Sequence, residues 1–150
     1  MMEAFDHILD KLPYDRPFLF VQGLNRVDSE GVEGYHTFDP ESYFYQGHFR
    51  GNPVTPGVIL VECMAQIGLV CLGIHLMGQE KQPIKEGLIA MAHAEVDFLH
   101  AVLPGERVTV RSEKVYFRFG KLKCKVRMTN SNGQLVCSGT LSGMMKTEHE

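Results

Sequence analysis

The residues best suited to chemistry lie close together near the middle of the chain, in the stretch Gly47–Gln66, GHFRGNPVTPGVILVECMAQ. His48 is followed fourteen positions later by Glu62. A histidine accepts a proton near neutral pH, and burial in an apolar segment raises the pKa of a glutamate so that it can donate one. The pair predicts acid–base chemistry, with His48 as general base and Glu62 as general acid.

Two backbone amides between these side chains could stabilise a negative charge. Gly57 and Val58 follow Pro56 and are expected in the first turn of a helix, where N–H groups lack intrahelical partners and the helix dipole favours an anion. A glycine also lets a ligand come close to the backbone. A base, an acid and an oxyanion site together fit removal of a proton next to a thioester carbonyl, with loss of a β-hydroxyl group.

Each of these features also has a purely structural interpretation. A buried Glu62 could simply pair with Gln66, a loop histidine such as His48 is usually structural or exposed, and Gly-Pro loops are usually only turns. Cys63 could be a nucleophile, but a cysteine in an apolar helix usually packs in the core. The combination of the features, rather than any one of them, favours a chemical role.

A long apolar helix must carry Glu62. Thr55 is expected to cap this helix and Pro56 to occupy its first position. The helix should run to about Met77, with Gly78 just beyond its end. Its polar side chains after Val58 are Glu62, Gln66 and His75. Such a helix is apolar enough to cross a membrane, but Glu62 and Gln66 share one face and every later segment predicts strands, so we expect no membrane span and a helix buried by a sheet.

The remaining elements are a short first helix and a series of strands. An amphipathic helix is expected over 3–12, ended by Pro13. Strand patterns cover 17–21, 27–38, 88–99, 107–119, 121–128 and 135–145. Asn132-Gly133 indicates a hairpin turn. This order predicts an α+β fold with a single domain over 1–150, in which a curved antiparallel sheet wraps around one long central helix.

Length and composition exclude several classes of protein. A chain of 150 residues with 44% hydrophobic residues has the length of one folded domain and is not disordered. Its net charge of -3 excludes a globally basic nucleic-acid-binding protein. Free thiols, with no signal-peptide pattern at the N-terminus, predict a cytoplasmic protein. The cysteines lack both C-x-x-C and zinc spacing, and they are Cys63, Cys71, Cys124 and Cys137.

The charges are unevenly distributed along the chain. The segment 107–127 holds eight Lys or Arg residues and one acid. Within it, basic residues at 121, 123, 125 and 127 alternate with apolar ones, which is typical of a half-buried strand. The basic side chains could form a solvated sheet face or a surface for an acidic partner.

The central stretch resembles the signature of the hot-dog-fold 3-hydroxyacyl-[acyl-carrier-protein] dehydratases, roughly G-H-F-P-G-x-P-x-x-P-G-V-x-x-x-E-x-x-A-Q. The matching positions are Gly47, His48, Phe49, Gly51, Pro53, Pro56, Gly57, Val58, Glu62, Ala65 and Gln66. The segments 12–21 and 98–106 are similar to two further regions of that family. With glutamate at position 62, the chain resembles the FabZ-like branch of the family, since the isomerising branch carries aspartate there.

The resemblance implies an enzyme, a hydro-lyase that converts (3R)-3-hydroxyacyl-carrier thioesters to trans-2-enoyl thioesters without a metal or cofactor. His48 would take the C2 proton and Glu62 would protonate the leaving hydroxyl. The amides of Gly57 and Val58 would polarise the thioester, and the Val54 carbonyl would orient the His48 ring. The residues expected to bind substrate are Phe49, Gln66 and Phe98.

The resemblance also implies partners and a cellular role. The substrate would arrive on an acyl carrier protein, attached through phosphopantetheine. The protein would form a homodimer or a trimer of dimers, in which His48 of one subunit faces Glu62 of the other. It would serve fatty-acid, polyene or related lipid synthesis, with no nucleic-acid partner.

Three departures from the family pattern bear on the carrier and the pathway. Arg50 stands where the family has proline, and Gln22-Gly23 where it commonly has Asp-Arg. The family's basic docking residues are replaced at Asp97, Leu99 and His100. A specialised pathway such as polyene synthesis is therefore one hypothesis. A hot-dog acyl thioesterase and a non-catalytic subunit of a dehydratase heterodimer are the alternative functions.

Overall fold

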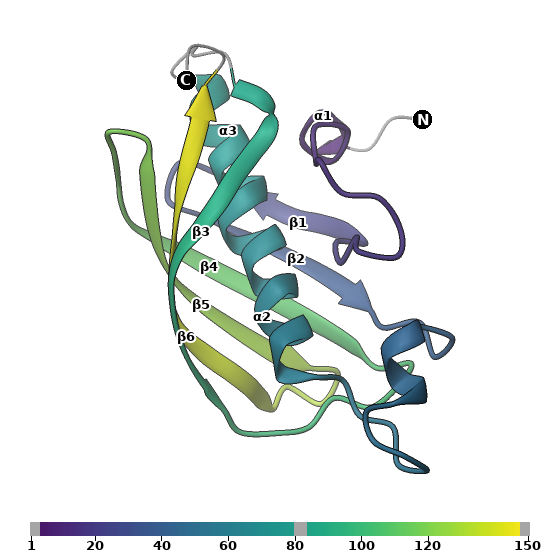
Figure 1. The fold of residues 1–150 in the computed structure, drawn as a ribbon. Helices are drawn as coiled ribbons and strands as arrows, with labels where there is room; N and C mark the ends of the chain where they lie inside the picture. Colours follow the sequence, from purple (N-terminus) through teal and green to yellow (C-terminus); the bar gives the residue numbers. More distant parts are fainter. Residues whose placement is uncertain (1–3, 80–83, 148–150) are drawn as a thin grey trace.

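In the computed structural model, which describes residues 4–79 and 84–147, antiparallel strands form one curved sheet around a long helix (Figure 1). The strands are β1 (Gly23–Val27), β2 (Gly31–Thr37), β3 (Ile84–Phe98), β4 (Arg107–Arg118), β5 (Lys121–Asn130) and β6 (Leu135–Thr147). Their order across the sheet is β1-β2-β4-β5-β6-β3. The predicted α+β architecture is confirmed.

The long helix runs without a break from Gly57 to Gln79. It consists of α2 (Gly57–Ala65), a π-helical segment η2 (Gln66–Cys71) and α3 (Leu72–Gln79). It therefore ends two residues later than expected. Thr55 does not cap it, because Pro56 occupies the N-cap position and no side chain there bonds to the first turn. By length and apolar composition Gly57–Gln79 could cross a membrane, but 78% of its most apolar window is buried inside the protein, as in the core helix of a globular fold.

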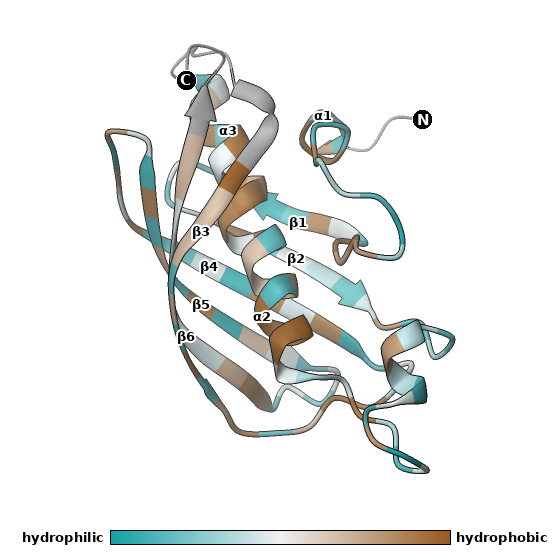
Figure 2. Ribbon diagram, in the orientation of Figure 1, coloured by the Kyte–Doolittle hydropathy of each residue, from teal (hydrophilic) through white to brown (hydrophobic). Residues whose placement is uncertain are grey.

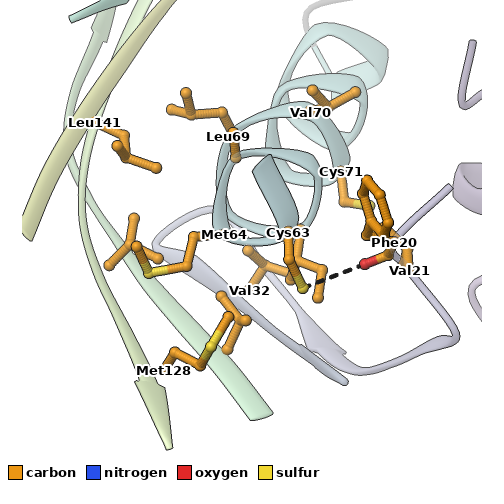
Figure 3. Close-up of a cluster of buried hydrophobic side chains, with 14 of the residues drawn as sticks. Phe20, Val21, Val32, Cys63, Met64, Leu69, Val70, Cys71, Met128 and Leu141 are labelled. Carbon is orange, nitrogen blue, oxygen red and sulfur yellow. Dashed lines mark hydrogen bonds between the residues drawn. The ribbon is translucent and has the colours of Figure 1, made fainter. Parts of the chain in front are cut away.

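Alternating residues of β5 explain how the sheet holds this helix. Leu122, Cys124, Val126 and Met128 are all fully buried. Lys125 and Arg127, which point to the other face, are exposed. Figure 2 shows the apolar residues concentrated along the helix. In Figure 3 the Met64 and Leu69 side chains point from the helix towards Leu141 and Met128 of the sheet.

The segment 17–21 was expected to be a strand, and this was wrong. Its backbone bonds to helix side chains instead of to another strand: the Phe20 N–H donates to Gln66 Oε1 over 2.8 Å, and the Cys63 thiol donates to the Phe20 carbonyl over 3.4 Å (Figure 3). Pro17 has no N–H to give to a ladder. The first strand therefore begins only at Gly23.

The other differences are local. The first helix, α1 (Asp6–Leu9), is shorter than the expected 3–12, of which residue 3 lies outside the described residues. The segment 27–38 contains a turn, because the Asp28 carboxylate accepts hydrogen bonds from the Glu30 and Gly31 amides and closes it before β2. A short 3-10 helix, η1 (Tyr43–Gln46), precedes the loop that carries His48.

β3 lies at one edge of the sheet. Among the strands that the structure describes, it pairs with β6 alone. Residues 90–95 are exposed without alternation, so neither face of this part of the strand is covered. An edge strand of this kind presents unpaired N–H and C=O groups to any second strand that approaches it.

Candidate active site

His48 lies in the loop between η1 and α2, and that loop is closely cross-linked by its own backbone. The Val54 N–H donates to the His48 carbonyl over 2.8 Å, and Phe49 and Asn52 exchange two hydrogen bonds of 3.0 Å. The Thr55 N–H donates to the carbonyl of Val102, in the connection between β3 and β4, over 2.8 Å. The dense glycines and prolines of the sequence thus follow one fixed path.

The His48 ring has a defined tautomer. Its Nδ1 lies 3.0 Å from the Val54 carbonyl oxygen. A carbonyl can only accept, so Nδ1 carries the proton and Nε2 keeps a free lone pair. The Phe49 ring stacks on the imidazole with centroids 4.1 Å apart. This half-buried ring therefore presents Nε2 as a proton acceptor.

A cavity of about 390 Å³ opens beside His48 and the first turn of α2. Its lining residues are His48, Val54, Thr55, Gly57, Leu60, Phe98, Leu99, His100 and Ala101. A Cβ at Gly57 would lie 3.2 Å from the Phe98 ring, so the glycine is what leaves room there. First-turn amides at the cavity could receive the oxygen of a carbonyl as it gains charge.

Glu62 lies on another side of the helix, against the segment that contains Phe18. Its Oε2 accepts a 3.0 Å hydrogen bond from the Gln66 side-chain amide. Burial raises the pKa of the Glu62 carboxyl, and the bond from Gln66 opposes part of that rise. A carboxyl group in this setting holds its proton to a higher pH than usual, as a general acid requires.

Gln66 is enclosed within the single chain. The side chain is fully buried. Its Nε2 donates to the Phe18 carbonyl and to Glu62, both over 3.0 Å, and its Oε1 accepts from the Phe20 N–H. These contacts hold Glu62 in place and tie the N-terminal segment to the helix, and the expected substrate contact of Gln66 stays a prediction.

His48 and Glu62 do not both line the 390 Å³ cavity described above. Glu62 is absent from the lining of the His48 cavity. Around that cavity several apolar side chains are more than half exposed: Phe49 (55%), Val58 (77%) and Leu99 (58%). Phe98 is half exposed.

Some residues of the site were not found from the sequence. Tyr14 lies close enough to Glu62 for the carboxylate to raise its pKa, which burial and Glu62 together bring to about 12. Tyr45 and Thr55 form a buried hydroxyl pair at the base of the His48 loop. No spacing rule connects these residues to the central stretch. Among the described residues, no group of three or more His, Cys, Asp or Glu side chains is placed to hold a metal ion.

A curved antiparallel sheet around one long helix is the hot-dog fold, and solved structures agree. The dehydratase heterocomplex ApeI:P from Xenorhabdus doucetiae matches with a TM-score of 0.78 at 14% identity, over 95% of this chain and 93% of the other. The smu.793 protein of Streptococcus mutans, bound to acetyl CoA, matches with a TM-score of 0.66 at 15% identity, over 91% and 96%. At these identities the likeness concerns the fold alone.

Comparisons of sequence show the family as well as the fold. A family model described as a FabA-like domain matches residues 12–141. The 3-hydroxyacyl-[acyl-carrier-protein] dehydratase FabZ of Caldicellulosiruptor bescii is 32% identical over 146 residues, 93% of this chain and 96% of the relative. The FabZ of Clostridium perfringens is 31% identical over 144 residues, with the same coverage. The chain belongs to the FabA-like family and, like its FabZ relatives, is a hydro-lyase.

Proposed function

We propose that the protein removes water from (3R)-3-hydroxyacyl thioesters carried by an acyl carrier protein and yields trans-2-enoyl thioesters. One observation carries this proposal: the His48 ring, with Nδ1 bound to the Val54 carbonyl, shares a cavity with the first turn of α2. The FabZ relatives bear the name of that reaction. A free Nε2 beside helix amides is the arrangement that proton abstraction next to a carbonyl requires.

In the proposed reaction, every proton and electron pair is accounted for without a metal or cofactor. His48 Nε2 takes a proton from C2, and the electrons of that C–H bond form the C2=C3 double bond. The C3–O bond breaks, and the hydroxyl leaves as water with a proton from Glu62. The amides of Gly57 and Val58 hold the thioester oxygen while it carries negative charge. Proton transfer from the imidazolium to the Glu62 carboxylate, through water, restores both residues.

Phe49 and Phe98 are proposed to contact the substrate. Phe98 lines the cavity beside Gly57, and Phe49 stacks on the base. Both rings are at least half exposed in the single chain, so both have surface free for a ligand. The acyl group would lie against these apolar rings while its polar thioester meets the helix amides.

We further propose that the working enzyme is a homodimer, alone or as a trimer of dimers. Edge-to-edge pairing of two β3 strands would cover the exposed segment 90–95 and continue the sheet. A two-fold axis would bring two copies of the exposed apolar rim around His48 to the same interface. The absence of Glu62 from its own chain's His48 cavity supports a site completed by Glu62 of the second copy.

The basic outer face of β4 and β5 supports binding to an acidic carrier. Lys125 and Arg127 are exposed there, while Arg111 is engaged by Glu33 at 2.6 Å. The hairpin between these strands lies at the opposite end of the sheet from the His48 loop (Figure 1).

We propose that the protein acts in the cytoplasm, which its four buried free cysteines support. We also propose that the chain acts as one domain and serves fatty-acid or polyene synthesis. A hypothetical thioesterase protein of Streptococcus pneumoniae is similar in fold alone, at 16% identity. A non-catalytic subunit would be expected to lack His48 or Glu62, and both are present.

The test is mass spectrometry of a (3R)-3-hydroxyacyl carrier thioester after incubation with the protein. Loss of one water from the acyl group is expected with the natural chain and not with His48→Ala. The exposed His7, outside the site, supplies the matched control His7→Ala, which should act normally. Release of free acid would show a thioesterase, and equal water loss with His48→Ala would refute the role of His48.

A further inference from the structure

Two hydroxyl groups are paired in the protein interior at the base of the His48 loop. Tyr45 Oη and Thr55 Oγ1 lie 2.5 Å apart, one hydroxyl donating to the other. Tyr45 is 6% exposed and Thr55 is 4% exposed. Burial raises the pKa of Tyr45, so its phenol keeps its proton near neutral pH. The pair joins η1, before the loop, to Thr55, two residues before α2.

This pair is the outermost of three successive links across the loop. Inside it, His48 and Val54 are joined twice, by the Val54 N–H to the His48 carbonyl and by His48 Nδ1 to the Val54 carbonyl. Further in, Phe49 and Asn52 are joined by two backbone bonds. The Tyr45–Thr55 link is the only one of the three made by two side chains, so it can be removed without altering the backbone.

The peptide group between Val54 and Thr55 connects this link to the imidazole. Its carbonyl accepts from His48 Nδ1 at 3.0 Å, and its N–H donates to the Val102 carbonyl at 2.8 Å. Rotation of that peptide plane would move the acceptor away from His48. The Thr55 side chain, bound to Tyr45, resists the rotation.

We propose that Tyr45 and Thr55 are positioning residues for His48, because their buried hydroxyl pair fixes the peptide group whose carbonyl sets the tautomer and direction of the imidazole. The inference rests on the proposed function, in which His48 is the base. Thr55 also lines the cavity beside His48, but in this proposal both residues act through His48 and not on the reacting atoms. A base displaced by even a fraction of an ångström transfers a proton more slowly, while binding of the substrate is little changed.

The test compares Tyr45→Phe and Thr55→Val with Thr55→Ser, which keeps the hydroxyl. The first two are expected to lower kcat about tenfold with KM within about twofold, and their combination to be no worse than either alone, since both remove one interaction. Thr55→Ser should keep most of the natural kcat. Tyr43→Phe, an exposed tyrosine of the same short helix, is the matched control and should be neutral.

A second readout does not depend on turnover. Nitrogen NMR of isotope-labelled histidine reports which ring nitrogen of His48 is protonated. The natural protein should show the Nδ1–H form, and Tyr45→Phe and Thr55→Val a mixture of tautomers, in proteins whose melting curves show them folded at the assay temperature.

The outcomes separate this inference from the proposed function. Water loss that depends on His48, together with full kcat and an unchanged tautomer in Tyr45→Phe and Thr55→Val, would overturn only the positioning role. A Thr55→Ser variant as slow as Thr55→Val would overturn it as well. If the natural protein removes no water, or if His48→Ala keeps its rate, the proposed function fails, and the NMR comparison still decides whether the hydroxyl pair orients the ring.

Discussion

Glu62 accepts a 3.0 Å hydrogen bond from Gln66, one helical turn further along, and the same amide group also donates to the Phe18 carbonyl. The carboxyl group is thus held by a residue that is itself fixed through both polar atoms of its side-chain amide. Burial still raises the Glu62 pKa in spite of this bond. The helix can therefore keep a proton donor at a defined place in an apolar setting.

The raised pKa of Glu62 makes a prediction about stability and pH. The folded protein holds this proton to a higher pH than the unfolded chain, so ionisation of Glu62 costs stability as pH rises from its ordinary value of 4.5 through the raised value. Glu62→Gln should therefore melt at a higher temperature than the natural protein near neutral pH, and the two should converge below 4.5. A constant difference across the pH range would contradict this account.

Gln66 should contribute more to stability than an ordinary surface glutamine. Gln66→Leu leaves the Phe20 N–H and the Phe18 carbonyl without their partners, which should cost about 2–4 kcal/mol of the free energy of unfolding. Chemical denaturation measures the loss. Gln134→Leu, in the exposed hairpin turn, is the control and should cost less than about 1 kcal/mol. Equal costs for the two variants would show that Gln66 does not hold the N-terminal segment.

Gly57 should be intolerant of a side chain, because a Cβ there would lie 3.2 Å from the Phe98 ring and would occupy the space in front of the first-turn amides. Gly57→Ala is expected to lower kcat/KM by about tenfold or more, and a substrate titration separates the two parameters. Gly47→Ala is the matched control, since a Cβ at Gly47 meets nothing within 4 Å. Similar kinetics for both alanine variants would argue against an oxyanion role for the Gly57 amide.

The uncovered β3 edge predicts association in solution. Sedimentation equilibrium should give a mass of about 34 kDa, twice the 16.9 kDa of one chain. If three dimers associate, the mass should be three times that of the dimer. A protein that stays at 16.9 kDa at all concentrations used for turnover would rule out a site shared between chains.

Much of the fold follows from local sequence patterns. The strict alternation in 121–128 corresponds to β5, and the apolar run after Pro56 to the buried helix, because side-chain periodicity decides which face is covered. His48, Glu62 and Gly57 could be proposed from residue type and spacing alone, since their chemistry depends on identity and on a short stretch of chain.

The parts that could not be predicted depend on contacts between distant positions. Gln66 bonds to Phe20 across 46 positions, and this bond occupies the Phe20 N–H that a strand over 17–21 would have used. Thr55 looked like a helix cap, but its hydroxyl is paired with Tyr45 instead. No periodicity reports which of two available partners a polar side chain will choose.

A site shared between two chains can be tested with a mixture of two inactive variants, His48→Ala and Glu62→Gln. Each alone should remove no water from the carrier-bound 3-hydroxyacyl thioester. After subunit exchange, confirmed by native mass spectrometry, the mixture should recover about a quarter of natural turnover, because half of the dimers are mixed and each mixed dimer holds one intact pair. No recovery in a mixture that has exchanged, or natural turnover by either variant alone, would contradict a site in which His48 and Glu62 of two chains remove water together.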